Sequence, residues 1–280
     1  MTKLKKTIGI IGYGFVGRAV GQMSEVFDVN VFDPYIEEHS GYDVREKAYV
    51  SDFVFVCVPT PEGSDGKLDT SIVDGAAHIW NNYNHRSLHG NRNSILVIKS
   101  TIEPGTVDSL RSRMGRTNIV HNPEFLTQRT AMEDFRNPLE VIVGGDPTVA
   151  RRVLDLFYSY YPINSDIKFF ATSAMEAELV KMVRNSFYAT KVSFFNEVHE
   201  LCGSLGLDYE KFRDLFTLGG THPWVARQHT QVPGPDGQLG YGGICLPKDS
   251  EGLLYLAESA GVDLSVLGAA IASNSKRREK

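Results

Sequence analysis

One cysteine stands where a thiol could act as a nucleophile. In the segment GYGGICLPKDS, Cys245 follows a glycine-rich stretch and precedes a predicted helix with Pro247 near its first position. A helix N-terminus and a nearby cation lower the pKa of a thiol, and the thiolate is the reactive form. Lys248 supplies the cation, and Asp249 could direct a water molecule or accept a proton. The pattern predicts an activated cysteine with space for a ligand beside it.

The other two cysteines favour a structural interpretation. Cys57 lies in an apolar run and Cys202 near the end of a predicted helix, so we expect both to pack as small apolar residues. An odd and widely spaced set of three predicts neither a disulfide framework nor a metal site.

Two polar residues have a spacing that would let both bind one oxygen atom. Lys181 and Asn185 are four residues apart in a predicted long helix and therefore share one face. Such a pair can hold a substrate hydroxyl and stabilise the oxyanion that it becomes. Exposed Lys and Asn are common, however, and the spacing alone favours two solvated residues.

A glycine pattern near the N-terminus indicates a dinucleotide. In GYGFVG, Gly12, Gly14 and Gly17 follow an apolar β-branched run and open a helical stretch. The first glycine permits a tight turn, the second a close approach of the backbone to a pyrophosphate, and the third close helix–strand packing. Asp33 ends the next predicted strand, where a carboxylate binds a ribose 2′-hydroxyl and favours NAD. A glycine turn without a ligand is the less favoured alternative.

Alternating strands and helices around this motif predict a doubly wound, Rossmann-type α/β sheet with parallel strands. The predicted strands are residues 7–12, 29–33, 52–58, 94–100, 118–123, 140–145 and 167–172. The character changes at residue 172, which predicts an NAD-binding domain of residues 1–172 and a helical domain of residues 173–280. The second domain is built on one helix of roughly 30 residues, a length suited to a spine or a dimer interface.

Capping signals place the helices of this second domain. Ser173 and Glu176 form a predicted capping box at the start of the long helix. Asp208 is the expected N-cap of a second helix, and Gly261 should follow the end of the helix that begins near Pro247. A last helical segment follows it.

Bulk composition excludes several classes of protein. The chain has 280 residues, 42% of them hydrophobic and 22% charged, with a net charge of −5. This acidic balance argues against a nucleic-acid partner. The apolar run at the start is too short to span a membrane. We expect a soluble cytoplasmic protein.

Six motifs together resemble the UDP-glucose/GDP-mannose dehydrogenase family. They occur in the family's order and extend over essentially the whole chain. They are VPTPEGSDGKLD (58–69), KSTIEPGTV (99–107), NPEFL (122–126), the AMEDFRNP that follows it, ELVKMVRNSF (178–187) and GYGGICLPKD (240–249).

The resemblance implies a four-electron oxidation of a nucleotide sugar, with UDP-glucose the expected substrate and NAD the cofactor. Cys245 matches the nucleophile that holds the intermediate aldehyde as a thiohemiacetal and then as a thioester. Lys181 and Asn185 match residues that stabilise oxygen at the reacting carbon. Asp249 matches a carboxylate that helps to activate water.

Further positions match the family's binding residues. Glu124 and Thr101 match a pair in the acid–base and water network, and Lys248 matches a lysine near the cofactor. The expected cofactor-binding residues are Gly12, Tyr13, Gly14, Phe15, Val16, Gly17, Asp33, Val58, Pro59, Thr60, Ser100, Thr101 and Lys248. The expected substrate-binding residues are Glu124, Phe125, Leu126, Lys181, Asn185, Tyr241, Gly242 and Gly243.

The sequence departs from the family's pattern in two places. Gln128 and Arg129 stand where the family usually has a Glu-Gly pair. A family arginine ahead of the cysteine loop has no aligned equivalent, since Arg227 is near the place but does not match it. His222 or Trp224 could contact substrate, although we expect Trp224 to pack in its loop.

Length is the largest departure, because family members usually have a further α/β domain that binds the nucleotide. The chain is therefore a compact variant, a fragment, or a protein whose missing part comes from a second chain. A homodimer through the long helix is expected. The alternative functions are a β-hydroxyacid dehydrogenase, which needs no cysteine, and a non-catalytic or partner-dependent NAD-binding protein.

Overall fold

The computed structural model describes residues 5–63, 67–86, 90–162 and 165–278, and the chain divides into two compact units. The first contains residues 1–61 and 68–181, and the second contains residues 62–67 and 182–280. Residues 64–66, inside the motif at 58–69, lie outside the described residues. None of the helices in the described ranges has the length and apolar character that a bilayer-spanning helix needs.

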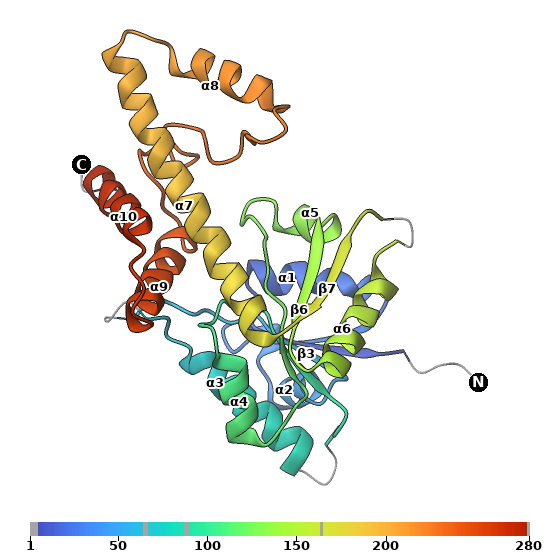
Figure 1. Cartoon of the computed structure of the whole chain (residues 1–280). Helices are drawn as coiled ribbons and strands as arrows, with labels where there is room; N and C mark the ends of the chain where they lie inside the picture. The colour runs from blue at the N-terminus through green and yellow to red at the C-terminus, as the bar shows by residue number, and fades with distance from the viewer. Residues whose placement is uncertain (1–4, 64–66, 87–89, 163–164, 279–280) are drawn as a thin grey trace. The chain divides into compact units, whose positions relative to one another are not determined.

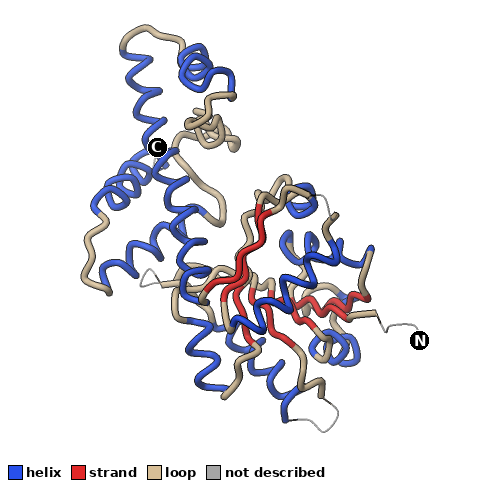
Figure 2. The backbone as a smooth tube through the Cα atoms, turned by 45° about the vertical axis from the view of Figure 1, so that its right-hand side comes forward, coloured by secondary structure: helices blue, strands red, loops and turns tan. Residues whose placement is uncertain are grey.

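The first unit is built on one seven-stranded sheet of order β2-β1-β3-β4-β5-β6-β7. Figure 2 shows these strands with helices on both sides of them. The strands are β1 (Thr7–Ile11), β2 (Asp28–Phe32), β3 (Phe53–Val56), β4 (Ile95–Ile98), β5 (Ile119–His121), β6 (Glu140–Gly144) and β7 (Lys168–Thr172). Each coincides with a predicted strand, and the α/β fold class is confirmed.

The alternation of side chains along the central strands explains why both faces are covered. Phe53 and Phe55 of β3 pack on one face, whereas Val54 and Val56 pack on the other. Helices α1 (Phe15–Gly21), α5 (Ala131–Arg136) and α6 (Pro147–Tyr160) bury apolar residues against the first face. Helices α2 (Tyr42–Tyr49), α3 (Ser71–Asn81) and α4 (Thr106–Met114) cover the second.

The sheet is not wholly parallel, which corrects the predicted topology. Strand β6 pairs antiparallel with β5, through His121 and Gly144, and β7 then runs parallel to β6. The segment between β5 and β6 contains only the short α5, which packs against α1. The side chain of Gln22, the C-cap residue of α1, donates to the Met132 carbonyl of α5. Since the chain does not cross back over the sheet, it enters β6 in the reverse direction.

A long helix, α7 (Ala174–Ser204), follows β7 directly and runs without a break through 31 residues (Figure 1). The predicted capping box is present, because the Ser173 hydroxyl accepts from the Glu176 amide and the Glu176 carboxylate accepts from the Ser173 amide. The predicted long helix is confirmed.

The second unit adds α8 (Tyr209–Thr217), α9 (Leu246–Ser259) and α10 (Ser265–Arg278). Asp208 caps α8 by accepting from the Glu210 and Lys211 amides, as its position predicts. The expected packing of Trp224 is wrong, because the indole is 89% exposed. Its loop turns through local contacts instead, since the Trp224 amide donates to Nδ1 of His222.

Gly144 at the end of β6 is required by the close approach of α7. A methyl group there would lie 2.4 Å from Cβ of Ala177 and 2.6 Å from the Ser173 carbonyl oxygen. We predict that Gly144→Ala lowers the free energy of unfolding by about 1–3 kcal/mol, the usual cost of overpacking. Chemical denaturation measures the change.

The matched control is Gly75→Ala in α3, where an added methyl group meets nothing within 4 Å. This substitution should stabilise the protein by about 0.5–1 kcal/mol, because alanine restricts the unfolded chain and favours helix. Equal effects of the two substitutions would contradict the packing at Gly144.

Candidate active site

The glycine loop after β1 has the geometry that a dinucleotide motif requires. Gly12 has a φ of +87°, and a side chain there would lie 2.7 Å from the Cys57 carbonyl oxygen. A side chain at Gly17 would lie 2.1 Å from the Gly12 carbonyl oxygen, whereas one at Gly14 would meet nothing within 4 Å. The outer glycines are therefore required by packing, and the middle one leaves the backbone open to a ligand.

Asp33 lies beside this loop, directly after β2. Its carboxylate accepts from the Tyr13 amide at 2.7 Å and from the Tyr35 amide at 2.9 Å. Two hydrogen bonds fix the carboxylate and leave it further acceptor capacity, which suits a ribose hydroxyl.

A cleft of about 510 Å³ opens on the same side of the first unit. It is lined by Gly14, Phe15, Arg18 and residues 128–133. Gln128 and Arg129, where the sequence departs from the family's pattern, thus line a cleft at the glycine loop. The predicted residue Val16 is in the first turn of α1.

The remaining predicted residues of the first unit follow the carboxyl ends of parallel strands, where ligands bind in open α/β sheets. The Ser100 hydroxyl, after β4, donates to the Val58 carbonyl, after β3, at 2.7 Å. This bond joins two loops that contain the other predicted residues, Pro59, Thr60 and Thr101. Thr60 and Thr101 are buried, and Pro59 is exposed.

Glu124 and Lys181 form a buried ion pair in the first unit. Nζ of Lys181 lies 2.8 Å from Oε1 of Glu124, and the two residues are 3% and 7% exposed respectively. The Leu126 amide donates to Oε2 of Glu124 at 2.7 Å, and the Phe125 ring lies 5.7 Å from the ammonium. Burial raises the pKa of Glu124, but Lys181, the Leu126 amide and Lys99 outweigh it and hold the pKa below its usual value. Glu124 is therefore a carboxylate at neutral pH.

Lys99 is a second buried lysine near this carboxylate, and the sequence reasoning missed its role. Its ammonium donates to Oδ1 of Asn122 at 2.8 Å, and the Asn122 amide donates to the Ile142 carbonyl at 2.7 Å. Lys99 thus fixes the loop that leads to Glu124. Burial lowers the pKa of Lys99 to about 8. A lysine directly after the apolar run of β4 is the sequence feature that could have identified this residue.

Cys57 and Cys202 are placed as packing residues. Burial raises the pKa of Cys57 to about 12, despite the opposing effect of Lys99, so the group is a neutral thiol. Cys202 is 3% exposed and packs with Phe195 and Tyr209.

A second polar cluster lies wholly within the second unit and centres on Asp249, which is 0% exposed. Nδ2 of Asn185 lies 2.5 Å from one carboxylate oxygen, and Nζ of Lys248 lies 2.6 Å from the other. Cys245 is the N-cap residue of α9, and its carbonyl accepts from the Asp249 amide at 3.0 Å. Tyr241, Gly242 and Gly243 form the loop before it. Lys248, predicted near the cofactor, pairs here with Asp249.

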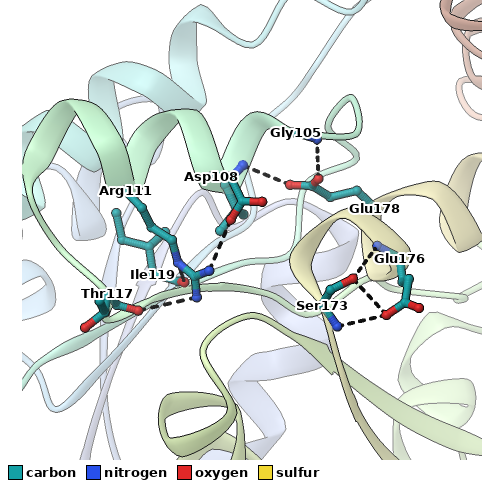
Figure 3. Close-up of polar contacts among 9 residues, drawn as sticks. Gly105, Asp108, Arg111, Thr117, Ile119, Ser173, Glu176 and Glu178 are labelled. Atoms are coloured by element: carbon teal, nitrogen blue, oxygen red, sulfur yellow. Dashed lines mark hydrogen bonds and ion pairs between the residues drawn. The ribbon is translucent and has the colours of Figure 1, made fainter. Parts of the chain in front are cut away.

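Glu178 is a further buried acid that the sequence did not single out. Its carboxylate accepts from the Gly105 amide at 2.6 Å and the Val107 amide at 2.9 Å, at the start of α4 (Figure 3). Burial raises its pKa to about 7, although these two amides oppose the shift. Glu178 holds the loop that contains Thr101.

Two models of one family match the chain. The NAD binding domain of the UDP-glucose/GDP-mannose dehydrogenase family matches residues 37–161, and the central domain of that family matches residues 175–276. The chain belongs to this family. Residues 37–161 accordingly belong to the family's NAD-binding domain, and NAD is the cofactor.

Individual relatives agree with the family. The chain is 34% identical over 230 residues to UDP-glucose 6-dehydrogenase of Rickettsia typhi, covering 81% of this chain and 50% of that one. It thus spans about half the length of this curated relative. A UDP-glucose dehydrogenase structure from Pyrobaculum islandicum matches with a TM-score of 0.79 and 27% identity, over 98% of this chain and 69% of that one.

A smaller enzyme shares the fold over nearly its full length. The structure of Mycobacterium tuberculosis 3-hydroxyisobutyrate dehydrogenase matches with a TM-score of 0.72 and 18% identity, over 98% of this chain and 94% of that one. At this identity the likeness concerns the fold alone.

The raised pKa of Glu178 predicts how stability depends on pH. The folded protein holds this proton up to about pH 7, whereas the usual value for the group is 4.5. The carboxyl therefore stabilises the fold in acid and loses that contribution as pH rises from about 4.5 to 7. We predict that the unfolding free energy of the wild type, relative to Glu178→Gln, decreases across this window. Denaturant titrations at several pH values measure the difference.

Glu176, on the same helix, provides a control with the opposite sign. Hydrogen bonds from Thr172 and Ser173 lower its pKa, so its contribution is present above the usual value and is lost as pH falls. A wild-type advantage over Glu178→Gln that does not change with pH would contradict the burial of an ionisable Glu178.

Proposed function

We propose that the chain oxidises the C6 alcohol of a nucleotide sugar to a carboxylate, most simply UDP-glucose to UDP-glucuronate. One alcohol, one water and two NAD⁺ give one carboxylate, two NADH and three protons. The observation behind the proposal is the state of Lys181 and Asn185, which are one turn apart on α7. Each is buried, at 3% and 8% exposure, and each is bonded to an acid, Glu124 and Asp249 respectively. Solvated residues would be neither buried nor bonded to an acid.

The cofactor would lie against the loop of residues 12–17, with Asp33 holding a ribose hydroxyl. The cleft at Gly14 and its arginines suit the negative charge of a pyrophosphate. Bound NAD supplies the acceptor for the hydride that leaves the substrate carbon. The chain's own residues bind and orient the sugar and move its protons.

The proposal gives the residues of each polar cluster a role in the reaction. The Lys181 ammonium and the Asn185 amide hold the substrate oxygen and stabilise negative charge on it, an effect worth about 10²–10³ in rate for one donor. The Cys245 thiolate adds to the aldehyde carbon, and its place as N-cap of α9 favours that anion. The adduct is a thiohemiacetal, and loss of its hydride to the second NAD⁺ leaves a thioester on Cys245. Glu124, Thr101 and Asp249 then hold and deprotonate the water that releases the acid and the thiolate.

The thiol step makes the proposal testable by stoichiometry. Wild-type chain with UDP-glucose should yield about two NADH for each sugar consumed. Cys245→Ser should lose this turnover, because the aldehyde can no longer be held as a thioester precursor. Absorbance at the NADH band, with chromatography of the sugar products, gives the ratio.

Cys202→Ala is the matched control, since this thiol is packed in the helical unit and should leave the ratio unchanged. One NADH per sugar, or full activity in Cys245→Ser, would contradict the thioester mechanism. Activity on small hydroxyacids that survives Cys245→Ala would favour the β-hydroxyacid dehydrogenase instead. NAD binding without turnover on a panel of UDP- and GDP-sugars would favour a non-catalytic binding protein.

We also infer a homodimer through the helical domain, on an apolar stripe of α7. Phe187, Phe194 and Leu201 are seven residues apart and are 62%, 57% and 55% exposed. Seven residues are nearly two helical turns, so the three side chains lie along one face. A second copy with the same stripe would bury it.

We predict that the double variant Phe187→Asp, Phe194→Asp halves the mass measured by light scattering on a sizing column. In a dimer, each introduced aspartate would be buried opposite the same aspartate of the second copy. The two charges would repel each other and would lack solvation. Leu139→Asp, at an 88% exposed leucine of the first unit, is the control and should leave the mass unchanged. A wild type that already elutes as a monomer would exclude the dimer.

A further inference from the structure

The loop before Cys245 is held by side chains from two helices of the second unit. The Gly240 amide donates to Oδ1 of Asn196, on α7, at 2.8 Å. The Tyr241 amide donates to Oδ1 of Asn274, on α10, at 2.6 Å, and Nδ2 of Asn274 donates back to the Tyr241 carbonyl at 3.0 Å. Asn274 thus satisfies both backbone groups of one loop residue, as a neighbouring strand would.

This contact is closed to water and leaves little room for adjustment. Asn274 is 8% exposed and Tyr241 is 4% exposed. A side chain at Gly240 would lie 2.3 Å from Oδ1 of Asn274, so only glycine permits the approach. Buried backbone groups that lose their partners are costly, and the loop conformation is therefore tied to Asn274.

Tyr241 connects this contact to the start of α9, where the thiol lies. The Tyr241 ring packs with Ala189 and Val192 of α7 and against Leu246. Leu246 is the first residue of α9 and the direct neighbour of Cys245. Fixing Tyr241 therefore fixes the point where α9 begins, and with it the N-cap position of the thiol.

We propose that Asn274 is a positioning residue for Cys245, acting through Tyr241 to hold the thiol at the N-terminus of α9. The proposal rests on the proposed function only where it concerns turnover. The effect on the thiol itself can be measured without a substrate.

The experiment compares Asn274→Ala with Ser193→Ala in the 280-residue chain. Ser193 is 3% exposed on α7, and its hydroxyl donates to the Ala270 carbonyl of α10 at 2.9 Å rather than to the loop. Asn274→Ala loses the buried hydrogen bonds between α10 and the loop, whereas Ser193→Ala loses one buried hydrogen bond between α7 and α10. Iodoacetamide modification of Cys245, resolved from Cys57 and Cys202 by peptide mass mapping, reports thiol reactivity as a function of pH.

Asn274→Ala should slow Cys245 modification near neutral pH by about fivefold and move its midpoint to higher pH, because the thiolate loses the helix N-terminus. It should also lower kcat by about tenfold or more, since misplaced reacting groups lose rate steeply. Ser193→Ala should lower the melting temperature but leave the pH midpoint of modification in place.

Equal changes in the two variants would overturn the proposal, as would an unchanged Cys245 midpoint in Asn274→Ala. If Asn274→Ala does not fold, Asn274→Asp replaces it. That variant keeps the acceptor for the Tyr241 amide but loses the donor to the Tyr241 carbonyl, and the same comparison applies. A wild type without NADH formation from nucleotide sugars would contradict the proposed function alone, and the thiol measurement would still decide the role of Asn274.

Discussion

The buried ion pair between Lys181 and Glu124 fixes the arrangement of the first unit's polar residues. Removing one partner of such a pair leaves an uncompensated charge in the interior, at a cost of about 3–5 kcal/mol. Glu178, three residues earlier on α7, binds the amides of Gly105 and Val107. Neighbouring positions on one helix therefore hold the loop after β4 and the loop after β5. Thr101 and Glu124 are placed by α7 as much as by the sheet.

Charge around Glu124 also determines what this carboxylate can do. Lys181 is hydrogen-bonded to it, and Lys99 lies close enough to lower its pKa. A carboxylate kept ionised beside two ammonium groups can accept a proton or orient water, but it has no proton to give at neutral pH. This favours the role of base or water ligand over that of acid. In the second unit, Asp249 is likewise held by a lysine and an amide donor.

Local signals made much of the fold predictable. The strands were short apolar runs, the glycine spacing identified the first turn, and the caps at Ser173 and Asp208 depend on residues three or fewer positions away. The reversal of β6 was not predictable in this way, because it depends on where the short α5 packs. Exposure of Trp224 was missed for a related reason, since burial of a loop residue is decided by distant segments.

The candidate site was predictable to the extent that it coincides with motifs. Cys245 was singled out by its place before a predicted helix, Lys181 by its spacing from Asn185 and Glu124 by the family resemblance. Lys99, Glu178 and Asn274 were not predicted. These three bind the backbone or amide groups of loops that are remote in sequence, and a single sequence does not identify those partners. Their importance is visible only from burial and hydrogen bonding.

Burial also distinguishes the two interpretations of Lys181 and Asn185 that spacing left open. A joint between a helix and its neighbours needs no charges, and α7 supplies apolar contacts of its own through Ala174, Ala177 and Met182. Buried ion pairs can often be replaced by apolar residues without loss of stability. Lys181 and Asn185 lie on successive turns, and each is desolvated and bonded to an acid. They therefore add little stability that apolar residues at the same positions could not supply. Both residues are therefore not the solvated pair that their spacing favoured, and their buried polar contacts support the proposed binding of a substrate oxygen.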